Sequence, residues 1–315
     1  MNVDQIQHTI WLEKYRPQTL EDIALNPIAR KTLESFVQAG EFPNLFLCSR
    51  PGQGKTSLAK LLAYNVFGCD VLYVNASDEN NVDTMRNKVT EFAKTMSTNG
   101  KFKTVILDEC DGFATMQSQK ILRVLMEEVS DTTRFIIVAN SREKIIEAIQ
   151  SRCYFLDITP DKNEIGRRLC KILLSEGIEV NEDTLESLKQ LIAWCYPDVR
   201  SMVKHLQVNC NEGKFVLPKS IVDGSFVSTL FDKLFTDEPL DIRAFVLHSE
   251  DLFNNDYSKL LSELYHLLID SDKLNANLKI KWTITISDYL TKMSNSLDTE
   301  LTFSACIFTL LNQKQ

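Results

Sequence analysis

The stretch Ser49-Arg-Pro-Gly-Gln-Gly-Lys-Thr56 decides the fold of this 315-residue chain. It follows the apolar run Asn44–Cys48, which is typical of a buried strand, and it opens the amphipathic stretch Thr56–Phe67, which is typical of a helix. A glycine-rich turn between a strand and a helix surrounds a phosphate group with backbone N–H donors and the positive end of the helix. The order of strand, turn and helix therefore predicts a phosphate-binding loop, or P-loop, rather than a chance glycine turn.

The spacing within this loop gives several side chains an expected task. Lys55 is expected to reach the β- and γ-phosphates of a nucleotide, and the Thr56 hydroxyl is expected to hold Mg²⁺. Gly52 and Gly54 keep open the positions where the backbone comes closest to the phosphates. Ser49 replaces the glycine that usually begins the motif, which weakens the match slightly and leaves the other positions intact.

Three further apolar runs have the length and composition of buried strands. They are Val71–Asn75, Thr104–Leu107 and Arg134–Ala139, and helical patterns such as Gln117–Val129 and Glu143–Gln150 alternate with them. Strands that alternate with helices predict a parallel α/β sheet, whose ligands bind at the carboxyl ends of the strands.

Polar side chains stand at two of these strand ends. Asp108 and Glu109 end an apolar strand about 50 residues after the P-loop, as in a Walker B element. The first acid is expected to help hold Mg²⁺ through its water shell, and the second to act as a general base on the attacking water. Asn140 ends the next strand and is a candidate to orient that water. The alternatives are solvated acids in a turn and a loop-forming asparagine.

The strand pattern fades after Ile158. Apolar residues at helical spacing over Asn163–Glu176, Asn181–Cys195 and Val199–Val208 predict a small three-helix unit. A short break near Leu217–Phe226 separates it from a third, all-helical region. We therefore predict an α/β P-loop domain over residues 1–157, a helical lid domain over 158–227 and an all-helical collar over 228–315.

Composition narrows the function classes. The formal charge is −8, of which residues 228–315 carry −5; an acidic chain does not coat DNA with its whole surface but is compatible with one basic face. No apolar run reaches the roughly 20 residues of a membrane helix, and the N-terminus lacks the pattern of a secretory signal. The eight cysteines and four histidines lack zinc-site spacing, so we expect reduced core cysteines and a cytoplasmic location, in a bacterial host if the chain is viral.

Two arginines are candidates for contacts with anions. Arg152 lies in Ser151-Arg-Cys153, just past the predicted helix Glu143–Gln150, where a lone arginine is usually a surface ion pair. Arg200 lies at the start of a predicted helix, which is unfavourable for a cation in the helix dipole. A nearby anionic ligand explains this position, and pairing with Asp198 is the alternative.

These elements, in this order, resemble the AAA+ ATPases, and the sequence around them is similar to that of clamp loaders. Trp11–Pro17 resembles the adenine-side segment of that family, and Val74–Asp78 the corresponding loop of replication factor C small subunits. Ser118–Glu127 resembles the family's helix after Walker B, and Ser151–Cys153 its arginine-finger motif. Ser49, together with a PDVR motif in place of GDxR, is most similar to the large ATPase subunit of T-even-type bacteriophage clamp loaders. The specific likeness covers residues 11–210.

The resemblance implies a five-subunit spiral that uses ATP and Mg²⁺. ATP bound between subunits organises the spiral, which opens a ring-shaped sliding clamp. Primer–template DNA then enters and triggers hydrolysis, and the clamp closes on the DNA. The implied partners are the sliding clamp, primer–template DNA, a smaller clamp-loader subunit and other copies of this chain. In phage complexes four copies join one smaller subunit.

The resemblance also implies roles for individual residues. Asp108 serves Mg²⁺, Glu109 is the base, Asn140 is the first sensor, and Arg200 is the second sensor on the γ-phosphate. Arg152 reaches into the site of a neighbouring subunit. The nucleotide contacts that it implies are Leu12, Glu13, Lys14, Tyr15, Ala24, Gly52, Gln53, Gly54, Lys55, Thr56 and Ser57.

DNA contacts are expected to be electrostatic and largely independent of sequence. Lys120 and Arg123 are three residues apart and share one helix face, whereas Arg86 and Lys88 are two apart and do not, so at least one of these is expected to be only solvated. Gln119 matches a polar family position that couples DNA to the ATP site.

Two other function classes stay open on the sequence. One is a binding scaffold that has lost hydrolysis, against which Lys55, Asp108, Glu109 and Arg152 argue. The other is a different AAA+ motor, such as a helicase or a protein-unfolding ring. The sequence has no evident aromatic pore-loop motif, and a helical C-terminal region suits a collar better.

Overall fold

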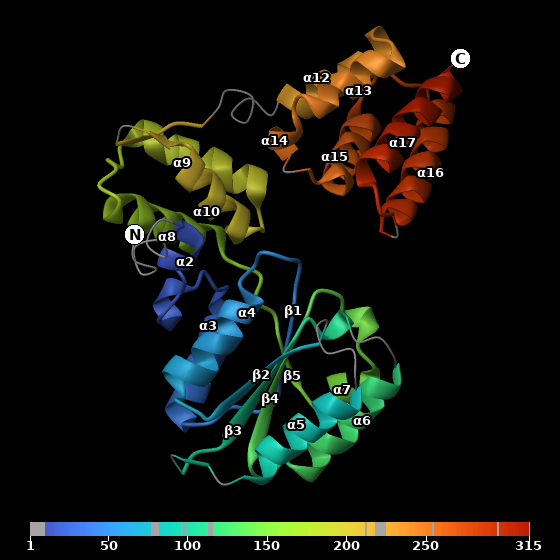
Figure 1. Ribbon diagram of the computed structural model, residues 1–315. Coiled ribbons are helices and arrows are strands. Elements are labelled where there is room, and N and C mark those ends of the chain that lie inside the picture. Colours follow the sequence, from blue (N-terminus) through green and yellow to red (C-terminus); the bar gives the residue numbers. More distant parts are fainter. Residues whose placement is uncertain are drawn as a thin grey trace, which may run out of the picture. The chain divides into compact units, whose positions relative to one another are not determined.

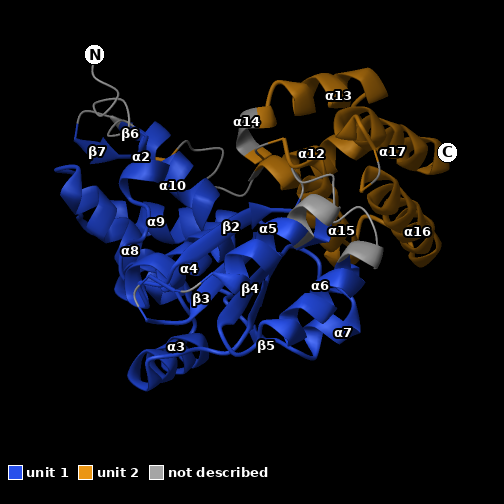
Figure 2. Ribbon diagram, turned by 60° about the horizontal axis from the view of Figure 1, so that its bottom comes forward, with its two compact units in different colours: residues 1–216 blue, residues 217–315 orange. Residues whose placement is uncertain are grey.

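The computed structural model describes residues 10–76, 82–95, 97–98, 100–112, 116–211, 213–217, 225–253, 255–294 and 296–314. The chain forms two compact units, residues 1–216 and residues 217–315 (Figure 2). Unit 1 contains both the sheet and the first group of helices, so the predicted division at residue 157 falls inside one compact unit. The predicted domain limits therefore stay predictions.

Unit 1 is built on a five-stranded parallel sheet with the strand order β2-β3-β4-β1-β5 (Figure 1). Its strands are β1 (Leu45–Cys48), β2 (Val71–Asn75), β3 (Lys103–Asp108), β4 (Thr133–Ala139) and β5 (Tyr154–Leu156). The first four lie within one residue of their predicted limits, which confirms the α/β fold with a parallel sheet. The short edge strand β5 was not predicted.

The alternation of side chains along the central strands gives the sheet two apolar faces. Ile106, Ile136 and Val138 pack with α3 (Pro27–Ala39), α4 (Lys55–Lys60) and the π-helical segment η2 (Leu61–Val66). Val105, Leu107, Phe135 and Ile137 pack with α5 (Val82–Lys94), α6 (Met116–Glu128) and α7 (Glu147–Gln150) on the other face (Figure 1). Because both faces are covered, the strands are continuous apolar runs rather than alternating ones.

The predicted helix Glu143–Gln150 is wrong in its first half. The structure has a 3-10 turn, η4 (Arg142–Lys144), then extended backbone at Ile145 and Ile146, and only then the short helix α7. The cause is a side chain from another helix. The Gln119 amide donates to the Lys144 carbonyl at 2.7 Å and accepts from the Ile146 N–H at 2.8 Å, which occupies groups that a continuous helix would need.

Three helices follow the sheet, close to their predicted limits. They are α8 (Lys162–Ser175), α9 (Glu182–Cys195) and α10 (Val199–Val208), and each starts at an Asp or Asn whose side chain accepts backbone N–H bonds of the first turn. The short helix α2 (Trp11–Lys14) lies against α10, where the Trp11 N–H donates to Gln207 Oε1 at 3.0 Å. A small hairpin of β6 (Cys210–Asn211) and β7 (Lys214–Phe215) ends unit 1 and was not predicted.

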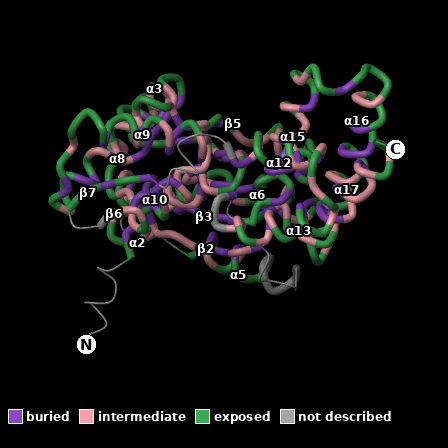
Figure 3. The backbone as a smooth tube through the Cα atoms, turned by 90° about the horizontal axis from the view of Figure 1, so that it is seen from above, coloured by how far each residue is buried: buried purple, intermediate pink, exposed green. Residues whose placement is uncertain are grey.

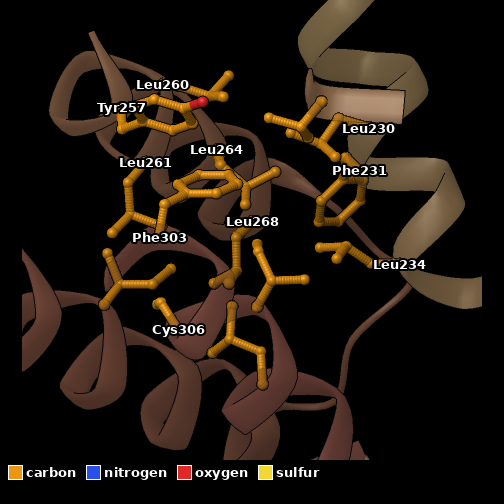
Figure 4. Packing of buried hydrophobic residues seen from close by; sticks show 14 of the residues in the cluster. Leu230, Phe231, Leu234, Tyr257, Leu260, Leu261, Leu264, Leu268, Phe303 and Cys306 are labelled. Atoms are coloured by element: carbon orange, nitrogen blue, oxygen red, sulfur yellow. The ribbon is translucent and has the colours of Figure 1, made fainter. Parts of the chain in front are cut away.

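Unit 2 is all-helical among its described residues. Its helices are α12 (Ser225–Thr236), α13 (Pro239–Leu247), α14 (Glu250–Phe253), α15 (Tyr257–Asp270), α16 (Ala276–Met293) and α17 (Thr299–Lys314). Leucines and aromatic rings from α12, α15 and α17 meet in its core (Figure 4). Figure 3 shows the burial of the described residues along the backbone. Within the ranges that the structure describes, no helix has the length and apolar character needed to cross a membrane.

Candidate functional site

The predicted P-loop joins β1 to α4 and has the backbone conformation that its glycines allow. Gly52 and Gly54 have φ values of +79° and +92°, in the left-handed region that favours glycine. Gly52 is also needed for space, because a Cβ added there would lie 1.9 Å from Asp198 Oδ1 at the start of α10. The loop is thus in direct contact with the helices that follow the sheet.

Lys55 is the first residue of α4, and its ammonium group lies under the loop. Its Nζ donates to the carbonyl oxygens of Ser49 at 2.7 Å and Arg50 at 2.9 Å. The residue is buried, and this burial lowers the pKa of its ammonium below the usual value. Among the described residues, the hydrogen-bond partners of this ammonium are neutral carbonyls, so it is well placed to gain an anionic partner such as phosphate.

Asp108 ends β3 beside the P-loop, and Glu109 follows it. The Thr56 hydroxyl donates to Asp108 Oδ1 at 3.2 Å, and the Glu109 N–H donates to the same oxygen at 3.0 Å. Glu109 has a φ of +53°, a left-handed conformation that is rare outside glycine, asparagine and aspartate and is often found at functional sites. Hydroxyl and carboxylate oxygens are the ligands that Mg²⁺ prefers, so Thr56 and Asp108 fit this ion as first predicted.

These residues line one small cavity at the carboxyl edge of the sheet. The cavity has a volume of about 130 Å³, and its walls include Lys55, Thr56, Asp108, Glu109, Asn140 and Arg200. The backbone N–H of Asn140, just after β4, donates to Asp111 Oδ1 at 3.1 Å. The structure therefore brings together six predicted site residues that span 146 positions of the sequence. Their individual chemical roles stay predictions.

A second cavity, of about 390 Å³, shares Gly52, Gly54, Ser57 and Arg200 with the first. Its walls hold most of the predicted adenine-side residues and add apolar side chains from α10. The predicted residues in its lining are Leu12, Glu13, Tyr15, Ala24, Gly52, Gln53, Gly54, Ser57 and Arg200. Two larger cavities of about 900 Å³ each lie elsewhere on unit 1, and none of the predicted site residues lines them.

Lys14 is the one predicted adenine-side residue that does not line this second cavity. Its Nζ forms an ion pair with Glu176 Oε1 at 2.7 Å, and the Tyr15 hydroxyl donates to the same oxygen at 2.6 Å. Burial and this bond to Glu176 raise the pKa of the Tyr15 hydroxyl. A carboxylate 162 residues away thus binds the Lys14 side chain in this structure, and the nucleotide contact expected of Lys14 stays a prediction.

Sequence reasoning missed Arg168, which also lines the second cavity. This arginine of α8 donates to the Tyr15 carbonyl and lies 3.7 Å from Asp22 Oδ1. Its side chain is only 13% exposed, and burial lowers the pKa of its guanidinium. The residue stands in an ordinary amphipathic helix with no motif around it, so the sequence carries no signal that singles it out.

Arg200 lies in the first turn of α10, where its N–H donates to the Gly52 carbonyl at 3.2 Å. The alternative of an Arg200–Asp198 pair is not what the structure has. Asp198 instead caps α10, since its carboxylate accepts from the Ser201 N–H at 3.0 Å and from the Ser201 hydroxyl at 2.7 Å. The Arg200 side chain lines both cavities.

Arg152 forms an ion pair with Glu127 at the end of α6. Its Nε donates to Glu127 Oε1 at 2.8 Å, Nη2 contacts the same oxygen, and Nη1 donates to the Ala148 carbonyl at 2.7 Å. In the isolated chain, Arg152 therefore forms the surface ion pair that the sequence left open as the alternative. Its side chain keeps 33% exposure, and it lies outside both cavities of its own subunit.

The candidate DNA residues differ in their surroundings. Lys120 on α6 and Lys88 on α5 are exposed, and Arg123 lies one turn after Lys120, with Nη1 3.5 Å from Glu127 Oε1. Gln119 is buried and bonded to the backbone of residues 144 and 146, and its expected role in coupling DNA to the ATP site stays a prediction. The side chain of Arg86 lies outside the described residues.

The parallel sheet, its P-loop and the acids at the end of the neighbouring strand define a P-loop protein of the AAA class. The model of the AAA family, described as the ATPase family associated with various cellular activities, matches residues 45–158. The chain is 41% identical to the replication factor C small subunit of Staphylothermus marinus over 66% of this chain and 64% of that protein. It is 35% identical to the replication factor C small subunit of Picrophilus torridus over 72% of this chain and 79% of that protein. It is 33% identical to that of Sulfurisphaera tokodaii over 84% of this chain and 77% of that protein.

The chain therefore belongs to the replication factor C small-subunit family. The match with the Staphylothermus protein, and that with the corresponding protein of Aeropyrum pernix, span 64% and 66% of those proteins, slightly under two thirds.

Proposed function

We propose that this chain is an ATPase subunit of a DNA polymerase clamp loader. In the proposed cycle, ATP binding opens a sliding clamp, and primer–template DNA then triggers hydrolysis and closure of the clamp on the DNA. The observation that carries the proposal is the small cavity at the sheet edge. In a chain of the replication factor C small-subunit family, this cavity gathers Lys55, Thr56, Asp108, Glu109 and Arg200.

Each residue of the cavity has its own proposed role in binding or hydrolysing the nucleotide. Lys55 exchanges its bonds to the Ser49 and Arg50 carbonyls for the phosphate oxygens. Thr56 and Asp108 would hold Mg²⁺, which neutralises charge on the phosphates when it is bound. The Glu109 carboxylate accepts the proton of the attacking water, and Asn140 orients that water. The second cavity takes the adenosine part, between α2 and α10.

The contact between the P-loop and α10 supports a role for the nucleotide in organising unit 1. Gly52 accepts the Arg200 N–H, and Asp198 leaves no room for a side chain at Gly52. A bound triphosphate would therefore touch both the sheet edge and the helical group, with Arg200 as the γ-phosphate sensor. A change at the γ-phosphate then reaches the α8–α10 helices through Arg200.

Arg152 is proposed to act in the site of a neighbouring subunit. It lines neither cavity of its own chain, and it is partly exposed next to Glu127. In the assembly it exchanges Glu127 for the γ-phosphate of the neighbour. The proposed assembly has four copies of this chain and one smaller subunit, as in T-even-type bacteriophages, to which Ser49 and the PDVR motif point.

DNA is proposed to bind through phosphate contacts of Lys120 and Arg123 on α6, with Lys88 on α5 as a further candidate. The α6 helix starts shortly after the Walker B acids and carries Glu127, the partner of both Arg123 and Arg152. A phosphate that draws Arg123 away from Glu127 would change the surroundings of Arg152. This shared carboxylate supports a link between DNA binding and the arginine finger.

The direct test purifies the chain with candidate clamp and smaller-subunit proteins and measures ATP hydrolysis with primed DNA. We expect the clamp and DNA to stimulate hydrolysis, and we expect Glu109→Gln to lower the rate by about 10²–10⁴ while ATP affinity stays unchanged. Glu128→Gln, an exposed acid on α6, is the matched control and should hydrolyse like the parent.

Three results would contradict the proposal. A parent assembly without turnover would favour the scaffold reading. A Glu109→Gln rate within threefold of the parent would mean that Glu109 is not the base. Strand displacement or protein unfolding without clamp loading would favour another AAA motor.

A further inference from the structure

Tyr73 on β2 reaches the Walker B acid from the neighbouring strand. Its hydroxyl donates to Asp108 Oδ2 at 2.8 Å. The sheet register explains the contact, because Tyr73 pairs with Ile106 and Asp108 lies two residues further on, which places both side chains on the same face. The sequence gives no sign of this role, since a tyrosine in the run Val71–Asn75 is an ordinary residue for a strand.

The hydrogen bonds of Asp108 are divided between its two oxygens. Oδ1 accepts from the Thr56 hydroxyl and from the Glu109 N–H, and Oδ2 accepts from Tyr73. A carboxylate offers about four lone-pair sites, so three are in use and one on Oδ2 is left for a further donor such as a metal-bound water. With both oxygens held, the carboxylate cannot rotate without losing bonds.

Tyr73 does not line the small cavity, whereas Thr56 and Asp108 do. It therefore acts on the site through Asp108 rather than by touching a ligand. The Nζ of Lys60 lies 4.1 Å from the centroid of the Tyr73 ring, a cation–π contact that fixes the ring from α4. The ring, which is partly exposed, thus contacts α4 through Lys60 while its hydroxyl contacts Asp108.

We propose that Tyr73 is a positioning residue for the Mg²⁺ site. Its hydroxyl keeps Asp108 turned so that Oδ1 meets Thr56, and Thr56 and Asp108 together would hold the ion. The inference rests on the proposed function, because it concerns the ion that accompanies ATP. Partners that orient the side chains around a bound metal typically change metal affinity or activity by 10–100-fold when they are removed.

The test is Tyr73→Phe, which removes one oxygen and keeps the ring beside Lys60. A fluorescent ATP analogue is bound to the purified chain at increasing Mg²⁺ concentrations and in EDTA. We expect the Mg²⁺ concentration for half-maximal binding to rise about tenfold, and the affinity in EDTA to stay within twofold of the parent. Tyr64→Phe, at an exposed tyrosine of η2, is the matched control and should leave both values unchanged.

Each other outcome would overturn either the role of Tyr73 or the proposed function. An unchanged Mg²⁺ dependence in Tyr73→Phe, with a parent that binds ATP, would overturn the role of Tyr73 and leave the proposed function intact. An equal loss of affinity in EDTA and in Mg²⁺ would also overturn it, because Tyr73 would then support the P-loop as a whole. A parent that does not bind the analogue at all would overturn the proposed function itself.

Discussion

Unit 1 and unit 2 bury different kinds of side chains. Unit 1 has an apolar core on both faces of its sheet, yet at the carboxyl edge of that sheet it also buries Gln53, Lys55 and Asp108. In the described part of unit 2, the buried polar residues are only Thr285 and Ser304. Burying charged groups is costly unless they have partners. Lys103, at the start of β3, is also buried in unit 1 and donates to the Phe92 carbonyl.

The difference teaches where function lies in this chain. The described helices of unit 2 pack around leucines and aromatic rings. Unit 1 has a polar cavity at its sheet edge, and we propose that this cavity binds the phosphates of a nucleotide. Substitutions in the unit 1 site should therefore change catalysis more than folding, and substitutions in the unit 2 core should change folding more than nucleotide binding.

The largest effect is expected from Arg152→Ala, which sharpens this comparison. An arginine supplied to a neighbouring site is worth about 10³–10⁵ in rate in the best-measured P-loop enzymes, so hydrolysis by the assembly should fall by that order. Stability should change by only about 0–1 kcal/mol, because the Glu127 pair is partly exposed. Arg167→Ala, which removes an exposed pair with Glu164 on α8, is the control and should keep full activity.

Mixed assemblies separate a role in the neighbouring site from a local role. Subunits with Arg152→Ala keep an intact P-loop, and subunits with Lys55→Ala keep an intact Arg152. If Arg152 acts on its neighbour, assemblies that contain both should recover part of the hydrolysis rate. No recovery in verified mixed assemblies would count against that role.

The second prediction tests whether the core of unit 2 affects folding without affecting nucleotide binding. Leu264 on α15 is fully buried, and Leu264→Ala should lower the free energy of unfolding of unit 2 by about 2–5 kcal/mol. Denaturant unfolding monitored by circular dichroism measures this, with Leu301→Ala, an exposed leucine of α17, as the control. ATP affinity of the folded chain should be unchanged. Lost affinity at a temperature where the variant is folded would show that unit 2 helps to form the nucleotide site.

The smallest effect is expected from the surface of unit 1. Charge reversal at Lys120 and Arg123 should weaken primer–template binding evenly across sequences. It should also flatten the slope of log K against log salt by about 0.9 for each lost phosphate contact. Lys189→Glu, on the exposed side of α9, is the matched control. Unchanged DNA affinity with an unchanged salt slope would mean that this face of α6 does not contact DNA.

Local patterns explain what the sequence predicted well. The apolar runs that form β1–β4 and the glycines of the P-loop are signals within a few residues, and their order along the chain brings the loop and Asp108 to one edge. What was missed depends on distant partners. Gln119 interrupts the helix expected over Glu143–Gln150, and Glu176 binds the Lys14 side chain. The strand β5 has only three residues, two of them exposed, which is too short a pattern to recognise.

The central claim is that Lys55 and the cavity at the sheet edge bind the phosphates of ATP. The most direct measurement is the unfolding of the purified chain with and without ATP and Mg²⁺. At 100 times its dissociation constant, ATP should stabilise the parent by about 2.7 kcal/mol, and it should give Lys55→Ala no stabilisation although that variant is folded without ATP. Lys189→Ala should behave like the parent. Equal stabilisation of the parent and of Lys55→Ala would contradict the claim.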